Sequence, residues 1–140
     1  MREILFRGKN EADVWHYGAY LPYESGDVAI LESFSKYGYE AVELSQRCKV
    51  IPETLGQYTG LTDKNGKKIF EGDIISTDIA RPYLIVEFRD GCFMFNCNDG
   101  GEDYYDIMLP ILKETQTQYK YGEIIGNITD NPELLKGGAE

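Results

Sequence analysis

The chain has 140 residues, of which 42% are hydrophobic and 13% aromatic, and its formal net charge is −10. This composition excludes a disordered chain, and no apolar run approaches the roughly 18 residues that span a bilayer. The acidic balance argues against direct nucleic-acid binding, because that affinity comes from Lys and Arg side chains that displace counterions from phosphates. The first ten residues also lack a signal-peptide core, so we expect a cytoplasmic protein that has no membrane segment and folds unaided.

The N-terminal third contains short runs of Val, Ile, Tyr and Phe that end in glycine or in a polar turn. Such runs are typical of β-strands. They predict strands at 3–8, 13–21, 27–33 and 39–44. We assign these strands to an N-terminal β unit that covers residues 1–50.

The stretch from Pro52 to Ile75 holds four glycines but no histidine and no cysteine. Its Asn65-Gly66 pair predicts a two-residue hairpin loop. That loop would place Lys64 opposite Lys67, Asp63 opposite Lys68, Thr62 opposite Ile69 and Leu61 opposite Phe70.

A bend at Glu71-Gly72-Asp73 follows this hairpin and precedes a further strand at 74–79. Here Gly72 is expected to supply a positive φ, and Asp73 to cap the turn. The whole stretch is therefore interpreted as scaffold: turn, strand, bend, strand.

The same stretch falls short of two ligand-binding loops. Gly60 and Gly66 enclose five residues where a phosphate loop has four, and Lys68 stands where that loop needs Ser or Thr. A calcium loop that began at Asp63 would need glutamate at its twelfth position, which is Ile74. We expect no cofactor.

Residues 83–97 carry the strongest hairpin signal of the chain, an Asp-Gly pair between two apolar and aromatic runs. If Asp90 and Gly91 form a type I′ loop, the register places six apolar residues on one face of the sheet. These residues are Leu84, Val86, Phe88, Phe93, Phe95 and Cys97.

Four carboxylates gather around the glycines at positions 100 and 101: Asp99, Glu102, Asp103 and Asp106. Clustered carboxylates can bind a divalent ion or act as an acid–base pair, although they more often belong to a solvated loop. We keep them as metal candidates, and we expect a loop here with a turn or two of helix within Glu102 to Leu109.

The C-terminal segment predicts a strand at 122–128 and a brief helix after it. Either Asp130 is the N-cap with Glu133 in the capping-box position, or Asn131 is the cap with Pro132 as the first helical residue. Residues 136–140 are expected to fray.

Three cysteines, Cys48, Cys92 and Cys97, form no C-x-x-C pair, which favours a reducing compartment over a disulfide framework. A zinc site built from them and from His16, the single histidine, is not expected. Structural zinc sites normally take ligands in close pairs, and Cys92 and Cys97 are expected on opposite strands. A cysteine–histidine nucleophile pair is not expected either, because no flanking segment is typical of one.

Two segments, VIPETLGQYTGLTDKNGKKIFEGDII (50–75) and IIGNITDNPELL (124–135), resemble the YopX family of phage and prophage proteins. MREILFRG and VWHYG are similar to the family's opening. The resemblance implies a mainly β fold with a small SH3-like barrel over residues 51–135, a mobile-element origin and no catalytic residues. The residues that carry it are interpreted as fold determinants: Gly56, Gln57, Tyr58, Gly60, Gly66, Gly72, Asp73, Gly126, Asn127 and Asn131.

We favour a non-enzymatic module that binds a host or phage protein inside the bacterium. In its extreme form this module is a DNA mimic, whose carboxylates imitate the spacing of phosphates. The alternative is a hydrolase that uses the carboxylates at 99–106 with a divalent ion. The sequence leaves open whether the chain forms a homo-oligomer.

Overall fold

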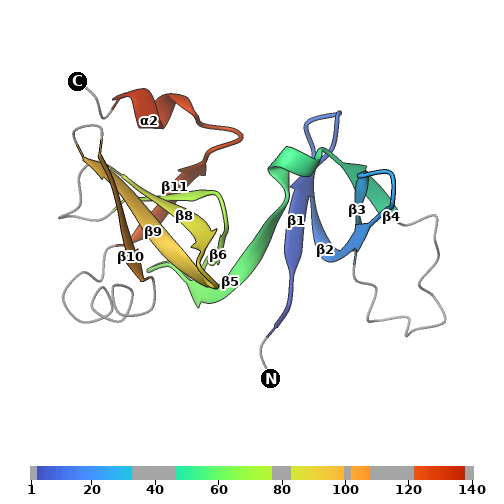
Figure 1. Cartoon of the computed structure of the whole chain (residues 1–140), viewed down its shortest axis with the longest axis horizontal. Coiled ribbons are helices and arrows are strands. Elements are labelled where there is room, and N and C mark those ends of the chain that lie inside the picture. The colour runs from blue at the N-terminus through green and yellow to red at the C-terminus, as the bar shows by residue number, and fades with distance from the viewer. Residues whose placement is uncertain (1–2, 33–46, 77–82, 100–101, 108–121, 138–140) are drawn as a thin grey trace. The chain divides into compact units, whose positions relative to one another are not determined.

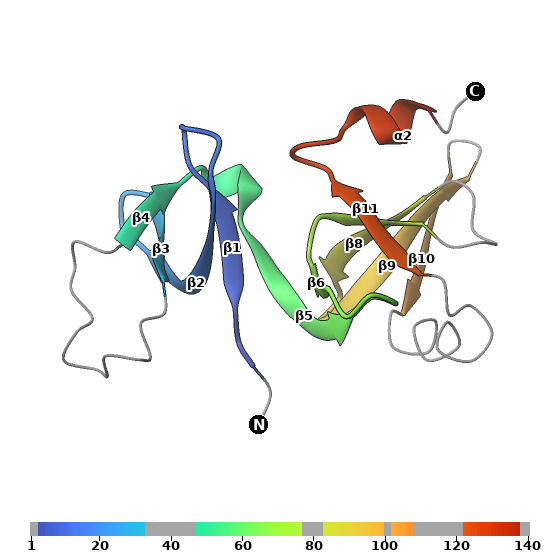
Figure 2. The same cartoon turned by 180° about the vertical axis from the view of Figure 1, so that it is seen from behind.

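The computed structural model describes residues 3–32, 47–76, 83–99, 102–107 and 122–137. The chain forms two compact units, Met1–Tyr58 and Thr59–Glu140. Both are built of antiparallel strands, and one short helix, α2, follows the last strand (Figures 1 and 2). The mainly β fold expected from the sequence is confirmed. No helix in these ranges is long and apolar enough to cross a membrane.

The first unit is a sheet in the order β4-β3-β2-β1, with the start of β5 paired to β1. Predicted strands at 3–8, 13–21 and 27–33 correspond to β1, β2 and β3, whereas the strand predicted at 39–44 lies outside the described residues. The strand bounds are β1 Phe6–Lys9, β2 Trp15–Pro22, β3 Val28–Glu32, β4 Arg47–Val50 and β5 Gly56–Thr62.

One face of this sheet forms the core of the first unit. Val28, Ile30 and Val50 are buried together, and Phe6 and Leu55 pack against them. The sequence between β4 and β5 makes a short 3-10 turn, η4 (Pro52–Thr54). The chain returns to β1 just before this turn, where the Ile51 backbone N–H donates to the Lys9 carbonyl at 2.8 Å.

The second unit contains a five-stranded sheet in the order β10-β9-β8-β7-β11. β5 continues into this unit and is followed by β6. The further bounds are β6 Lys68–Phe70, β7 Asp73–Ser76, β8 Leu84–Arg89, β9 Cys92–Asp99, β10 Glu102–Ile107, β11 Glu123–Asn127 and α2 Glu133–Gly137. Its core contains Ile69, Ile75, Leu84, Val86 and Phe95.

The β8–β9 hairpin has the predicted register. Leu84 lies opposite Cys97, Val86 opposite Phe95 and Arg89 opposite Cys92. Asp90 (φ 51°) and Gly91 (φ 83°) both have the positive φ that a type I′ loop requires. The turn type and the apolar pattern were therefore sufficient to place these two strands.

The predicted register of the β5–β6 turn is wrong by one residue. The Asp63 N–H donates to the Lys67 carbonyl at 2.9 Å, so the loop has three residues, and the Lys64 N–H donates to Gly122 at 2.9 Å instead of pairing with Lys67. Within the loop only Gly66 has a positive φ, 81°, which is typical of a type I turn that ends in a bulge. The Asp63 carboxylate stabilises this form by accepting from the N–H groups of Asn65 and Lys67, both at 2.9 Å.

The bend before β7 agrees with the prediction. Gly72 has a φ of 93°, and the buried Asp73 carboxylate accepts a hydrogen bond from the Phe70 N–H at 2.7 Å. Asp73 thus caps the turn that separates β6 from β7.

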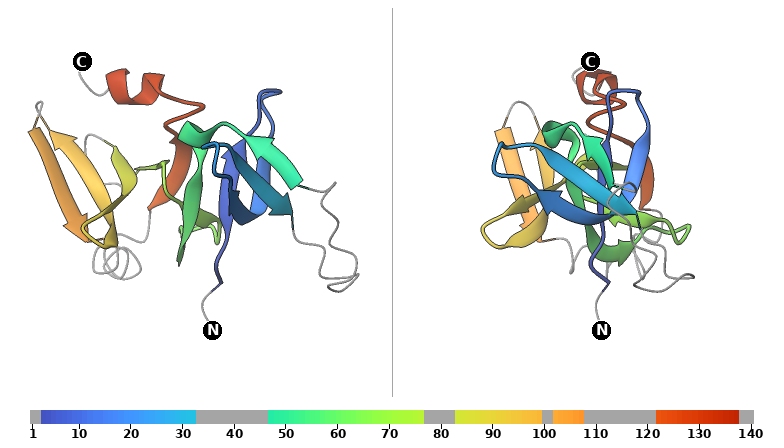
Figure 3. Two further views of the ribbon diagram at one scale, coloured as in Figure 1. Left: turned by 45° about the vertical axis from the view of Figure 1, so that its right-hand side comes forward. Right: turned by 90° about the vertical axis from the view of Figure 1, so that its right-hand side faces the viewer.

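The helix turns expected between Glu102 and Leu109 are not formed, because Glu102–Ile107 is a strand. Six residue pairs join β10 to β9, from Glu102 opposite Asp99 to Ile107 opposite Met94. This pairing satisfies the backbone of β10, and the adjacent tyrosines favour a strand. Figure 3 shows β9 and β10 side by side as a twisted ribbon.

The C-terminal segment forms the predicted brief helix. A 3-10-type bond from the Leu134 N–H to the Asn131 carbonyl at 3.1 Å precedes it, while the Asn131 side-chain oxygen accepts from the Asn127 N–H at 3.2 Å. The helix itself begins at Glu133 and includes Gly137, and residues 138–140 lie outside the described chain.

The expected SH3-like barrel is not confirmed. In the five-stranded sheet, β10 and β11 are the two edges, and no ladder joins them among the strands that the structure describes. The sheet is open.

Candidate metal centre

Three side chains that can bind metal meet in the first unit: His16 on β2, Glu32 on β3 and Cys48 on β4. One donor atom from each residue, a ring nitrogen, a carboxylate oxygen and the thiol sulfur, lies within 4.8 Å of the other two. No other such group of three occurs in the ranges that the structure describes.

The sheet register explains why these residues meet. Glu32 lies opposite Gly18, which is two residues from His16 on the same face of β2, and Cys48 lies opposite Ile30, two residues from Glu32. All three residues therefore share the core-facing side of the sheet, since residues two apart on a strand lie on one face.

Gly18 is necessary for this arrangement. A Cβ atom at this position would lie 2.0 Å from the Leu31 carbonyl oxygen, too close for any other residue unless the two strands separate. Gly18 therefore lets β2 and β3 approach closely where His16 has to reach Glu32.

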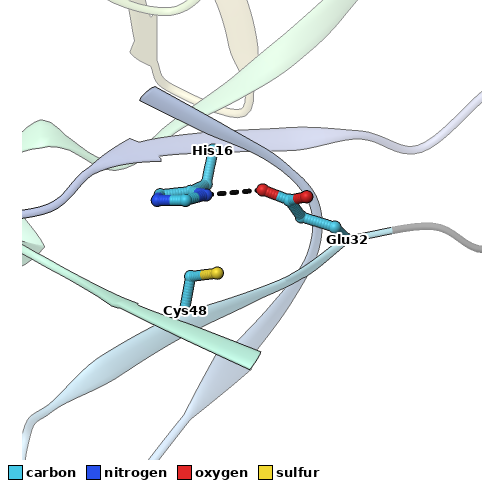
Figure 4. Close-up of side chains that lie close together, drawn as sticks. All are labelled: His16, Glu32 and Cys48. Carbon is cyan, nitrogen blue, oxygen red and sulfur yellow. Dashed lines mark hydrogen bonds and ion pairs between the residues drawn. The ribbon is translucent and has the colours of Figure 1, made fainter. Parts of the chain in front are cut away.

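His16 and Glu32 are in direct contact, as Figure 4 shows: Nδ1 of the ring lies 2.5 Å from the Glu32 carboxylate oxygen Oε1. The His16 side chain is 16% exposed and the Glu32 side chain 40%. The group is thus sheltered but within reach of solvent. In the same view, the sulfur of Cys48 points to the side on which the ring meets the carboxylate.

Asn10 determines which ring nitrogen of His16 carries the proton. Its Oδ1 accepts hydrogen bonds from the N–H groups of Ala12 and Val14, both at 2.9 Å. Its Nδ2, a donor, therefore faces His16 Nε2 at 3.0 Å. Nε2 has to accept, so the neutral ring carries its proton on Nδ1 and donates it to Glu32.

Burial raises the pKa of the Cys48 thiol above its ordinary value, and the nearby negative charge of Glu32 raises it further. A raised pKa keeps the sulfur protonated at neutral pH. A nucleophilic cysteine needs the opposite shift, so the cluster does not favour thiol catalysis. The donor set of imidazole, carboxylate and thiol is instead one that Zn²⁺ takes in proteins.

The expectation that Cys92 and Cys97 lie on opposite strands is wrong, because both belong to β9. The metal candidates named from the sequence were the carboxylates at 99–106. They did not include His16, Glu32 or Cys48. One signal for this group was available: Glu32 continues the alternation of Val28 and Ile30, so a carboxylate occupies a position on the apolar face.

The carboxylates proposed from the sequence lie on β9 and β10. Asp99 ends β9, and Glu102 lies directly opposite it. Asp103 and Asp106 also belong to β10, where they pair with Asn98 and Phe95 of β9. A metal site at these carboxylates stays a prediction.

The fold and the cluster define a protein of two small antiparallel β units with a group of potential metal ligands in the first. The family described as YopX protein matches residues 5–136. The chain belongs to the YopX family.

The crystal structure of protein EF1440 from Enterococcus faecalis has a similar fold. The TM-score is 0.57 at 22% sequence identity, over 96% of this chain and 99% of that chain. At this identity the likeness concerns the fold. Among curated proteins, none matches the chain.

Proposed function

We propose that this chain is a non-enzymatic module of phage or prophage origin that binds a protein partner in the bacterial cytoplasm. The observation that carries the proposal is the exposure of three tyrosines on β2 and the turn that follows it, with Tyr17 and Tyr20 on opposite faces of the strand. Tyr17 is 45% exposed, and Tyr20 and Tyr23 are each 38% exposed. We name these three residues the β2 tyrosines.

Cationic groups lie beside aromatic rings in the same unit. The guanidinium of Arg47 lies 5.6 Å from the centre of the Tyr23 ring, and that of Arg7 lies 4.8 Å from the Trp15 ring. Tyrosine, tryptophan and arginine are the residues that dominate the energy of protein interfaces. Arg7 is buried at 7% exposure, whereas Tyr23 and Arg47 are exposed, so the Arg47–Tyr23 pair supports binding of a protein rather than of a small molecule.

The partner is tested by affinity capture from the natural host, with wild type compared to a Tyr17→Ser, Tyr23→Ser double variant. Tyr20 is kept because its ring packs on Phe6 at 5.3 Å. Phe88→Ser is the matched control, since Phe88 is 52% exposed but belongs to the second unit. Melting curves establish that each variant is folded.

A protein retained by wild type and by Phe88→Ser but lost from the double variant supports the proposal. Capture of nothing at either low or high salt contradicts it, as does an identical set of proteins on all three chains. The DNA-mimic form rests on the net charge of −10. It predicts that duplex DNA displaces the partner and that high salt releases it.

We also propose that residues 51–135 form a small SH3-like barrel. Two hydrogen bonds support it, because they bring the β5–β6 turn to β11: Lys64 N–H to the Gly122 carbonyl at 2.9 Å and Ile124 N–H to the Asp63 carboxylate at 3.1 Å. In the five-stranded sheet β10 and β11 each pair with one neighbour. A crystal structure in which either strand also pairs on its other side would establish that the barrel is closed. Open edges on both strands would contradict it.

A further inference from the structure

The contact between His16, Glu32 and Cys48 has chemistry that an interaction module does not require. All three donors lie on the core-facing side of the first sheet, where apolar residues are the rule. Polar groups at such positions cost free energy unless they are satisfied. The His16 ring already has a partner on each nitrogen, Glu32 on Nδ1 and Asn10 on Nε2. The group is a candidate metal site because three different donor atoms converge within 4.8 Å of one another.

We propose that the first unit binds one Zn²⁺ ion through Nδ1 of His16, the carboxylate of Glu32 and the thiolate of Cys48, with water as the fourth ligand. Zinc takes such nitrogen, oxygen and sulfur donors at about 2.0–2.3 Å in a tetrahedron, which sets the donors about 3.3–3.6 Å apart. The present separations bracket this value: 2.5 Å between Nδ1 and Oε1, and at most 4.8 Å within the group. Shifts of about 1 Å in the side chains form the site.

The charges balance on binding. The thiolate and the carboxylate each contribute one negative charge, which together neutralise the ion, and the imidazole remains neutral. Cys48 loses its proton to solvent when its sulfur bonds to the metal. The proton on Nδ1 of His16 is replaced by the metal while Nε2 takes one up, so the net release is one proton per ion.

Asn10 opposes this arrangement in a specific way. With metal on Nδ1, the neutral ring carries its proton on Nε2, which then faces the Nδ2 donor of Asn10 at 3.0 Å. Asn10 cannot simply turn its amide over, because its oxygen already accepts from the Ala12 and Val14 N–H groups. The Asn10 contact must break when zinc binds.

Asn10→Asp removes the conflict. A carboxylate can accept from the two backbone N–H groups and from Nε2–H at once, and a carboxylate behind a metal-bound histidine raises metal affinity. We expect Asn10→Asp to bind zinc about tenfold more tightly than wild type. A histidine with a purely structural role would not produce this gain.

The experiment titrates the untagged full chain with Zn²⁺ alone against a chromophoric chelator. His16 is the only histidine in the chain, so a histidine tag would obscure the result. Calorimetry in two buffers of different ionisation enthalpy counts the protons released. Cobalt(II) is the spectroscopic probe, because a bond to sulfur gives a thiolate-to-metal absorption band.

We expect one ion per chain, about one proton released, and a cobalt–thiolate band. Zinc affinity should fall about a hundredfold or more in His16→Asn and in Cys48→Ser, and should be unchanged in Cys92→Ser, the matched cysteine control on β9. Circular dichroism without zinc establishes that the variants are folded.

The proposal is overturned if millimolar zinc produces no saturable binding, or if His16→Asn and Cys48→Ser bind as tightly as wild type. Weaker binding by Asn10→Asp also overturns it, and this arm does not depend on how well the ligand variants fold. The interaction proposed above is measured by partner capture, so either proposal can fail alone.

Discussion

The side-chain oxygen of Asn131 occupies the space beside Gly126 that any other residue would need there. A Cβ on Gly126 would lie 2.5 Å from Asn131 Oδ1. This oxygen accepts a hydrogen bond from the Asn127 N–H at 3.2 Å, and Asn131 precedes the terminal helix. Gly126 therefore permits the contact that links β11 to the helix start.

Gly126→Ala is expected to destabilise the protein by about 1–2 kcal/mol, because Asn131 must move away and the Asn127 N–H loses its acceptor. Asn131→Ala alone should have a similar cost, and the double variant should cost less than the sum, because each change removes the same contact. Urea unfolding of all four chains measures the coupling. Costs that add within about 0.3 kcal/mol would show that the two residues act independently.

Asp63 joins two parts of the second unit that are distant in sequence. Its Oδ1 accepts from the turn residues Asn65 and Lys67, and its Oδ2 accepts from the Ile124 N–H at 3.1 Å. Hydrogen bonds to a charged group contribute about 1.5–3 kcal/mol each. We expect Asp63→Ala to lower the free energy of unfolding by at least about 2 kcal/mol.

Asp63→Asn should have a smaller effect, since its amide oxygen can still accept within the turn while its nitrogen faces the Ile124 N–H. Lys64→Ala is the control, because Lys64 forms an ion pair with Glu123 at 3.6 Å that is partly exposed. Exposed pairs contribute about 0–1 kcal/mol. Equal losses for Asp63→Ala and Lys64→Ala would contradict the role given to the carboxylate.

Gly91→Val tests the best-predicted element of the fold. Gly91 has a φ of 83° and no atom within 4 Å of a Cβ built on it, so the change introduces strain without a clash. A β-branched residue resists this φ, and we expect a loss of more than about 1 kcal/mol. An unchanged melting temperature would mean that the loop tolerates another turn type.

The thiol of Cys48 should react slowly with iodoacetamide in the folded protein. Burial, and then the charge of Glu32, raise its pKa, and only the thiolate is alkylated. The midpoint of the pH–rate curve should lie above the ordinary value of about 8.5. It should fall in Glu32→Gln, measured in a background that lacks the other two cysteines.

The same shift predicts how stability depends on pH. A folded-state pKa above the unfolded value means that the folded chain holds its proton more tightly. The contribution to stability is complete below the unfolded pKa, about 8.5, and is lost as the pH rises through the folded pKa. Urea unfolding at neutral and alkaline pH should show an alkaline loss in wild type that Cys48→Ser lacks.

Local features of the fold could be predicted from the sequence, and features set by distant pairing could not. The β8–β9 hairpin could be predicted because the Asp90-Gly91 turn and the apolar pattern of its strands both indicate the same register. The β5–β6 turn was placed one residue away, because Lys64 bonds to Gly122, which no local pattern reveals.

The candidate site could not be predicted, for the same reason. His16, Glu32 and Cys48 meet only after β2, β3 and β4 have paired in one register. The bend at Gly72 and Asp73 could be predicted because it depends on short-range backbone geometry. β10 was assigned to loop and helix because its partner, β9, determines its structure.

The position of β11 near the end of the chain affects how the protein can fold during synthesis. Strands β1 to β4 all end before residue 59, and only the start of β5 pairs with β1. In the second unit, β7 and the Asp63 carboxylate are bonded to residues of β11, which are synthesised last. Chains leave the ribosome from the N-terminus. We therefore expect the first unit of the nascent chain to fold before the second unit has been completely synthesised. A stop codon just before position 122 would then leave the first unit intact and the second without its last strand.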